Sequence, residues 1–305
     1  MRLKDTLKHF FATAAFLSFC GAAAQAATEH ALRVPSLAVE EEASGLDELT
    51  LDASATGKSE FEFTHKGRGQ ATTFRSHFEY IHRIQWNGPW HFQLGVDYDR
   101  FDFGGTALRT LPTTLQTVNI PLGIAYMVEG HVGFLAEIRP GFYFSQSVSR
   151  GAIDVPFNIG GGIPLIEGKL YGAWGVGTSV LRRYPVIPVV GVIWLISDEW
   201  RLMGYLPEPK LIFDASKDLQ IWAGGEIIVN SFKVGKMSRS HLSNTVVDYE
   251  EYRVGIGFDY KPSRTWTLTA AGGCAVVRNF DFWRANESYS AEPAPYLRVQ
   301  LSGAF

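Results

Sequence analysis

From about residue 58 onwards, apolar and polar residues alternate along the chain with a period of two. Between Phe74 and Trp86 the even positions are mostly apolar and the odd positions are mostly charged or polar. Side chains alternate across a β-strand, so this pattern predicts a strand with one apolar and one polar face. The same alternation returns in segments that begin near residues 90, 113, 131, 249, 264 and 295. A convincing helical period is missing after the N-terminus, and we predict an all-β protein.

The length of these segments points to a membrane. Several exceed the roughly 5 to 6 residues of an ordinary strand and reach the roughly 9–11 residues with which a tilted strand crosses a bilayer. Several also begin or end on Trp or Tyr, which favour the two membrane interfaces. Lipid would cover the apolar faces that water would otherwise contact. We therefore predict a single antiparallel up-and-down transmembrane β-barrel.

Turn lengths predict the number of strands. Tight turns such as Asn87-Gly88 alternate with longer loops such as 104–113, which is typical of short periplasmic turns and long extracellular loops. The pattern divides into about 13 segments, whereas two periplasmic chain ends require an even number. The irregularity lies between residues 150 and 214. Merging one pair there gives about 12 strands, which we prefer, and splitting one gives 14 as the alternative.

Three prolines inside the alternating segments oppose regular strands, because proline lacks the backbone donor of the ladder. They are Pro121, Pro140 and Pro156.

The N-terminus predicts export. Arg2, Lys4 and Lys8 precede a short apolar stretch, and Ala24-Gln25-Ala26 matches a cleavage site. We predict a signal peptide over residues 1–26, a flexible acidic periplasmic arm over 27–56, and an outer-membrane barrel over 57–305.

Composition narrows the function classes. Charged residues make up 19% of the chain and aromatic residues 13%. Removing residues 1–26 takes away three of the 28 basic and one of the 31 acidic side chains, which leaves a net charge of −5. This balance opposes a nucleic-acid partner. Cys274 alone remains, so the mature chain has no intramolecular disulfide.

The last segment ends the chain on an aromatic residue. Leu297, Val299, Leu301 and Phe305 share one parity, opposite Arg298 and Gln300. Together with Leu206-Pro207-Glu208-Pro209, Trp222-Ala223-Gly224-Gly225-Glu226 and Tyr252-Arg253-Val254-Gly255, this ending resembles a family of bacterial outer-membrane β-barrels of uncharacterised function. The resemblance covers roughly residues 60–305. It implies that Leu297, Val299, Leu301 and Phe305 form an assembly signal, which the barrel-assembly machinery recognises.

Charged residues of the polar parity are expected to face the lumen. They are His77, Glu79, Arg83, Asp97, Glu137, Arg139, Glu251, Arg253 and Arg298. Pairs such as His77 with Glu79, or His131 with Glu137, could bind a metal or act as acid and base. A narrow lumen in which charges pair with one another explains them better. No known catalytic or phosphate-binding motif is present, and we expect no enzyme activity, cofactor or metal.

We predict an outer-membrane, porin-like protein of a Gram-negative bacterium, acting as a structural barrel or a narrow passive pore for small solutes. Its expected partners are outer-membrane lipid and, during biogenesis, the assembly machinery; the sequence indicates no oligomeric state. Two alternatives stay open. One is an outer-membrane enzyme, a lipid hydrolase or protease, with its active site in the lumen or at the rim. The other is a soluble exported β-sheet binding protein.

Overall fold

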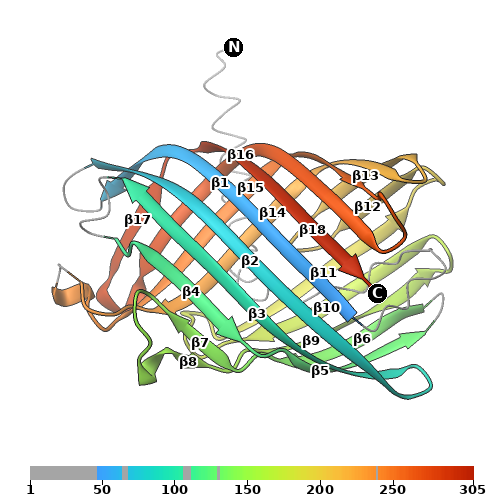
Figure 1. The fold of residues 1–305 in the computed structure, drawn as a ribbon, viewed down its shortest axis with the longest axis horizontal. Helices are drawn as coiled ribbons and strands as arrows, with labels where there is room; N and C mark the ends of the chain where they lie inside the picture. The colour runs from blue at the N-terminus through green and yellow to red at the C-terminus, as the bar shows by residue number, and fades with distance from the viewer. Residues whose placement is uncertain (1–46, 64–67, 106–110, 129–130, 238–239) are drawn as a thin grey trace, which may run out of the picture.

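The computed structural model describes residues 47–63, 68–105, 111–128, 131–237 and 240–305 as a closed barrel of strands (Figure 1). The strands are β1 (Asp47–Phe63), β2 (Arg68–Asn87), β3 (Trp90–Gly105), β4 (Thr114–Asn119), β5 (Leu122–Val128), β6 (His131–Ile138), β7 (Gly141–Phe144), β8 (Ile153–Asp154), β9 (Phe157–Ile166), β10 (Leu170–Thr178), β11 (Val186–Leu195), β12 (Trp200–Gly204), β13 (Lys210–Ser216), β14 (Leu219–Lys233), β15 (Val246–Tyr260), β16 (Trp266–Phe282), β17 (Glu287–Ala291) and β18 (Ala294–Ala304). Within these ranges, short 3-10 helices lie at Arg150–Ala152, Ser240–Leu242 and Trp283–Ala285. No helix in these ranges is long and apolar enough to cross a membrane.

The sheet closes between the two ends of the chain. β1 pairs antiparallel with β2 on one side and with β17 and β18 on the other, so that Leu51 lies between Phe78 and Leu301. At the very end, the backbones of Asp47 and Phe305 exchange two hydrogen bonds of 3.0 Å. We call this end of the barrel the Phe305 end. Closure leaves no strand edge at this seam, which is what an apolar solvent requires.

The barrel has 14 strands, because four of them consist of two segments each: β4 with β5, β6 with β7, β8 with β9, and β17 with β18. The preferred count of 12 is therefore wrong and the alternative of 14 is confirmed. The predicted irregularity lies at the segment 199–212, which the structure divides into β12 and the start of β13, with a turn at 205–209. β12 has only five residues and β13 seven, too few to show a clear alternation around Pro207 and Pro209.

Three of the interruptions occur at the prolines that opposed regular strands. Each proline lies in a two-residue gap between segments, and its carbonyl still accepts a backbone hydrogen bond from the neighbouring strand. These bonds run from Gly95 to Pro121, from Ile120 to Pro140 and from Arg139 to Pro156, at 2.9, 3.0 and 2.8 Å. The missing proline donor breaks the ladder locally, and the accepting carbonyl keeps the strand in the wall.

The first strand begins earlier than expected. β1 starts at Asp47, so residues 47–56 belong to the barrel and not to the predicted arm. In this segment Leu49, Leu51 and Ala53 alternate with Thr50 and Asp52. The alternation is short and follows directly on a run of acidic residues, so the sequence pattern did not reveal a strand there. The predicted signal peptide and residues 27–46 of the arm lie outside the described residues.

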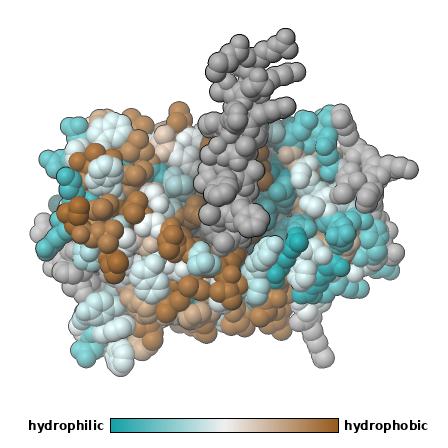
Figure 2. All heavy atoms as spheres, turned by 180° about the vertical axis from the view of Figure 1, so that it is seen from behind, coloured by the Kyte–Doolittle hydropathy of each residue, from teal (hydrophilic) through white to brown (hydrophobic). Residues whose placement is uncertain are grey.

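Apolar side chains cover the outer wall, as the alternation predicted. Val190 is 78% exposed, Leu297 70% and Ile256 68%, while their sequence neighbours of opposite parity face inward. Figure 2 shows apolar residues spread over the wall and hydrophilic residues gathered toward the ends of the barrel. A water-soluble monomer rarely exposes so large an apolar surface, whereas lipid would cover it.

Aromatic residues ring the Phe305 end on the outside. Trp86 packs on Phe92 with ring centroids 5.0 Å apart, and Trp90 lies 4.8 Å from Tyr126. Further pairs are Trp200 with Phe213, at 4.9 Å, and Trp266 with Phe305, at 6.2 Å. Amphipathic rings of this kind lie at headgroup level in barrels, so the ring marks one membrane interface.

The wall is not equally high all round. β11 pairs with β12 over only four residues, Val192 to Leu195, and the turn 205–209 lies beside the middle of β14. The neighbouring strands β14, β15 and β16 have 15, 15 and 17 residues. We call β8 to β13 the low wall and the remaining strands the high wall.

Candidate functional site: the barrel interior

A belt of charged side chains crosses the middle of the lumen. We call it the charge belt; its members are Asp52, Arg75, His77, Glu79, Asp97, Asp99, Glu137, Arg139, Glu226, Glu251, Arg253 and Arg298. They come from high-wall strands and their side chains are at most about a tenth exposed. An isolated buried charge would cost several kcal/mol, so the belt is stable only because its members pair.

One half of the belt surrounds Arg139. Its guanidinium contacts Glu137 beside it in the chain, and lies 3.1 Å from both Glu79 and Asp97. His77 lies 3.4 Å from Asp97. Two neutral side chains complete the pairing: Gln93 donates to Glu137 at 2.6 Å, and Asn119 to Asp97 at 2.9 Å. This half therefore joins β2, β3, β4 and β6, which follow one another along one side of the barrel.

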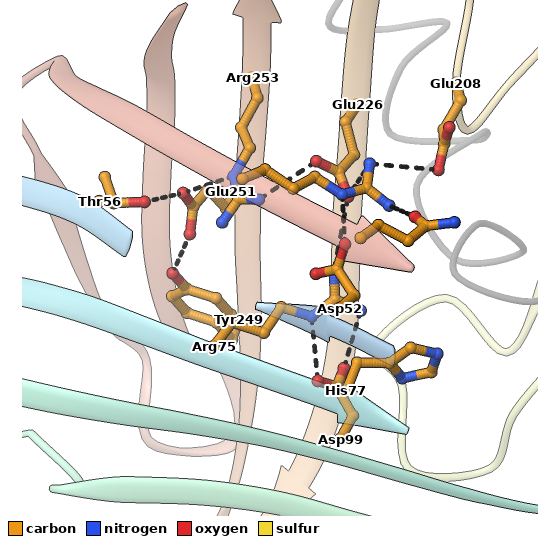
Figure 3. Close-up of polar contacts among 12 residues, drawn as sticks. Asp52, Thr56, Arg75, His77, Asp99, Glu208, Glu226, Tyr249, Glu251 and Arg253 are labelled. Carbon is orange, nitrogen blue, oxygen red and sulfur yellow. Dashed lines mark hydrogen bonds and ion pairs between the residues drawn. The ribbon is translucent and has the colours of Figure 1, made fainter. Parts of the chain in front are cut away.

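The other half centres on Glu226 (Figure 3). Its carboxylate lies 3.2 Å from Arg253 and 3.4 Å from both Arg75 and Arg298. Arg75 also forms two hydrogen bonds to Asp99, at 2.9 and 3.1 Å. Arg298 donates to Asp52 at 2.5 Å. Charge-assisted pairs of this kind fix side-chain orientation as well as charge, so the belt is a rigid network.

Glu251 links the belt to the barrel wall. It accepts from Arg253 at 3.0 Å and from the Thr56 hydroxyl at 2.7 Å, and the Tyr249 hydroxyl also donates to it (Figure 3). Glu251 is 0% exposed. The three donors satisfy its oxygens without water.

The structure brings together eight of the nine predicted lumen charges: His77, Glu79, Asp97, Glu137, Arg139, Glu251, Arg253 and Arg298. The ninth, Arg83, lies toward the Phe305 end, where it pairs with Glu48 at 2.6 Å. His131, named in a possible pair with Glu137, is the first residue of β6, and its side chain is not among those described.

Sequence reasoning missed four belt members and a neighbour of the belt. Arg75 and Asp99 have the same parity as His77 and Asp97, so the same signal could have found them. Asp52 was assigned to the arm. Glu226 follows a run of small residues, and Glu208, 3.7 Å from Arg298, lies in the unrecognised turn of the low wall.

Beyond the belt, an aromatic cluster fills the lumen toward the opposite end of the barrel. We call it the aromatic plug; all its members are at most 5% exposed: Phe61, Ala71, Phe101, Phe103, Leu111, Leu115, Ile228, Phe232, Val234, Leu242, Val247, Tyr249, Phe280, Phe282 and Tyr289. Ring centroids lie 5.1 Å apart in the Phe101–Tyr249 pair and 4.9 Å apart in the Phe103–Phe280 pair. These spacings are those of a packed protein core.

Part of this plug is a hairpin that folds into the lumen. We call residues 231–237 and 240–247, which include the ends of β14 and β15, the plug hairpin. It places Phe232, Val234, Leu242 and Val247 in the aromatic plug.

The plug hairpin reaches strands with which β14 is not paired around the barrel. Lys233 forms a parallel bridge with Phe144 of β7, and its carbonyl accepts from the Ser145 N–H at 3.0 Å. The Gly235 N–H donates to the Ser145 hydroxyl at 3.1 Å. The hairpin therefore crosses the barrel and is fastened to the far side.

The inner side of the low wall is apolar. Tyr171, Ala173, Ile187, Val189, Ile193 and Tyr205 form one buried cluster there. The inner face of the high wall thus carries charged side chains, and the inner face of the low wall carries apolar ones. The side chains of both sets are buried.

Two histidine–carboxylate pairs lie outside the belt. His82 Nδ1 is 2.8 Å from Asp47 near the Phe305 end, and His241 Nε2 is 2.6 Å from Glu287 near the other end. Among the described residues, no hydrogen bond joins a serine hydroxyl to either imidazole, and no group of three metal-ligating side chains occurs. The expectations of no enzyme activity and no metal stay predictions.

Solved structures that match the chain include outer-membrane channels. The toluene transporter TodX of Pseudomonas putida is 10% identical over 92% of this chain and 96% of its own, with a TM-score of 0.38. An outer-membrane channel from Pseudomonas putida F1 is 8% identical over 88% and 98%, with a TM-score of 0.44. The NanC porin is 7% identical over 84% and 100%, with a TM-score of 0.39. At these identities and TM-scores, the solutes of these proteins are not assigned to this chain.

No protein-family model matches the chain, and no curated protein matches it. Membership of the family suggested by the sequence motifs therefore stays a prediction.

Proposed function

We propose that this protein is a passive outer-membrane channel for small solutes, which its own plug hairpin holds closed in the conformation described. The Phe305 end is then periplasmic and the opposite end extracellular. The observation that carries the proposal is the hairpin in the lumen. The apolar outer wall and the aromatic ring support the location and oppose a soluble exported protein.

Barrel size favours a channel over a purely structural barrel. Side chains alone fill a barrel of about 8 strands, whereas barrels of 16 to 18 strands hold water. A barrel of 14 strands lies between these two sizes, so its wall side chains leave more of the interior to be filled. The plug hairpin supplies the missing volume through Phe232, Val234, Leu242 and Val247. A segment that fills a lumen from one end can also leave it, which wall strands cannot do.

Shortening the hairpin tests the proposal. Asn230 and Tyr249 are a cross-strand pair, so residues 231–248 can be replaced by a two-residue Asn-Gly turn. We expect the shortened barrel to give long-lived conductance steps in planar bilayers, because water then enters from the opened end and hydrates the charged side chains of the belt, which loosens their pairing. The unaltered protein should stay closed or open only briefly. A matched control shortens the turn 261–265 at the Phe305 end in the same way and should behave like the unaltered protein.

A crosslink provides the converse test. Ser145→Cys with Gly235→Cys, in a Cys274→Ser background, joins the hairpin to β7 where the two already share a hydrogen bond. Oxidation should abolish the brief openings and reduction should restore them. If the shortened barrel folds, judged by heat-modifiable gel mobility, and conducts no ions, the protein is a structural barrel and the channel proposal is wrong.

A further inference from the structure

The low wall ends in loops that present apolar side chains outward. We call Val148, Ile153, Val155, Val180, Tyr184 and Val186 the low-wall patch; they are 49 to 74% exposed. All of them lie at or near the barrel end opposite Phe305. Exposed apolar groups that cluster in this way mark an interaction surface.

The loop 179–185, which carries Val180 and Tyr184 of the patch, is firmly held. The Ser179 N–H donates to the Pro185 carbonyl at 3.0 Å, which closes the loop at its base. Asp154 of β8 accepts from the Val180 N–H at 3.2 Å and from the Ser179 hydroxyl. Leu181 is 6% exposed and packs with Tyr143 and Val246. These contacts fix the loop in a conformation in which Val180 and Tyr184 are exposed.

Two arginines lie in the same loop. The Arg183 side chain is 52% exposed; its guanidinium is 3.2 Å from Asp281 and 5.6 Å from the centre of the Tyr184 ring. Arg182 precedes it in the chain. A half-exposed guanidinium can accept a phosphate on its free side while it keeps its carboxylate partner, since it has five donors.

The patch continues the lipid-facing wall. Val186 begins β11, whose outer face goes on through Val190, 78% exposed, to Val192. On the high wall the residues toward the same end are polar, and Lys58, Glu62 and Glu292 are exposed there. Lipid therefore reaches the loops on the low side only. This step rests on the membrane location proposed above.

We propose that the low-wall patch, with Arg183, docks the phosphorylated lipid headgroups of the outer leaflet. Val180 and Tyr184 lie among the upper acyl chains and the headgroup boundary, where Tyr is favoured. The guanidinium of Arg183 binds the lipid phosphate by charge-assisted hydrogen bonds. The barrel is thereby fixed with its low wall level with the membrane surface and its high wall projecting beyond it.

Site-directed labelling tests the position of the loop. Val180→Cys and Lys58→Cys, each with Cys274→Ser, carry a polarity-sensitive fluorophore in vesicles of phosphatidylethanolamine and bis-phosphorylated lipid A. We expect the label at position 180 to be quenched by spin-labelled lipid and to be several-fold less sensitive to aqueous iodide than the label at position 58. Equal iodide access at the two positions, in protein that floats with the vesicles, overturns the proposal. Protein that does not float with vesicles contradicts the membrane location instead.

A second experiment tests the phosphate contact. Arg183→Gln should weaken binding of bis-phosphorylated lipid A, measured by native mass spectrometry of the detergent-solubilised barrel, by about fivefold. Binding of the dephosphorylated glycolipid should not change. Lys217→Gln is the control, because Lys217 is 90% exposed in a turn at the Phe305 end. Equal losses for both glycolipids, or no loss for either, overturn the role of Arg183.

Discussion

Arg253 shows that a buried charge in the lumen needs charged partners. It is 1% exposed and its guanidinium pairs with Glu251 and Glu226. We expect Arg253→Met to lower the free energy of unfolding by about 3 kcal/mol, because two buried carboxylates lose a partner. Urea unfolding of the barrel in lipid bicelles measures this change.

The matched control for Arg253 is an exposed cation. Lys217→Met should change the free energy of unfolding by less than about 0.5 kcal/mol, since Lys217 is 90% exposed. An equally small effect of Arg253→Met would mean that water solvates Glu226 and Glu251, and that the lumen is hydrated at the level of the belt.

At the scale of an element, β18 closes the barrel. Leu297 and Val299 are 70% and 54% exposed on its outer face, and Arg298 faces inward. Phe305 is 53% exposed and contacts Trp266, and its backbone exchanges two hydrogen bonds with Asp47. These contacts are few, so the residue contributes little to the finished barrel. Its role as an assembly signal, with Leu297, Val299 and Leu301, stays a prediction.

Removing Phe305 separates assembly from stability. We expect the shortened chain to accumulate poorly in outer membranes, yet to fold in detergent micelles with nearly the stability of the full chain. Quantitative immunoblots of membrane fractions and urea unfolding in micelles measure the two effects. Normal membrane levels of the shortened chain would show that the terminal aromatic is not read during assembly.

At the scale of the whole molecule, the closed ladder predicts detergent resistance. Breaking the barrel at any seam exposes backbone donors and acceptors, at several kcal/mol each in an apolar solvent. We expect the protein to sediment with outer membranes and to migrate faster on gels when it is not heated. Recovery in the soluble periplasmic fraction would contradict the membrane location and with it the channel proposal.

The sequence by itself determined the strands, their faces and most of the inward charges. Period two is a local property, so residues such as Ile256 and Arg253 reveal their sides of the wall without a fold. The signal failed where segments were short or irregular. β12 has five residues, and the bulge where β16 pairs with Tyr252 and Arg253 changes the parity, so that Arg278 faces inward.

Only the tertiary structure decided how the lumen is filled. Phe232 and Val247 alternate like any wall residues, and nothing in their local pattern shows that they pack in the lumen or that the adjacent Lys233 bridges to Phe144 on the far side. Similarly, Glu226 collects three arginines from three strands, at sequence separations of 27 to 151 residues. Such contacts depend on which strands are short, on where the hairpin of β14 and β15 enters the lumen, and on how the sheet closes into a barrel. These are properties of the closed sheet as a whole, and a period of two along one strand carries no record of them.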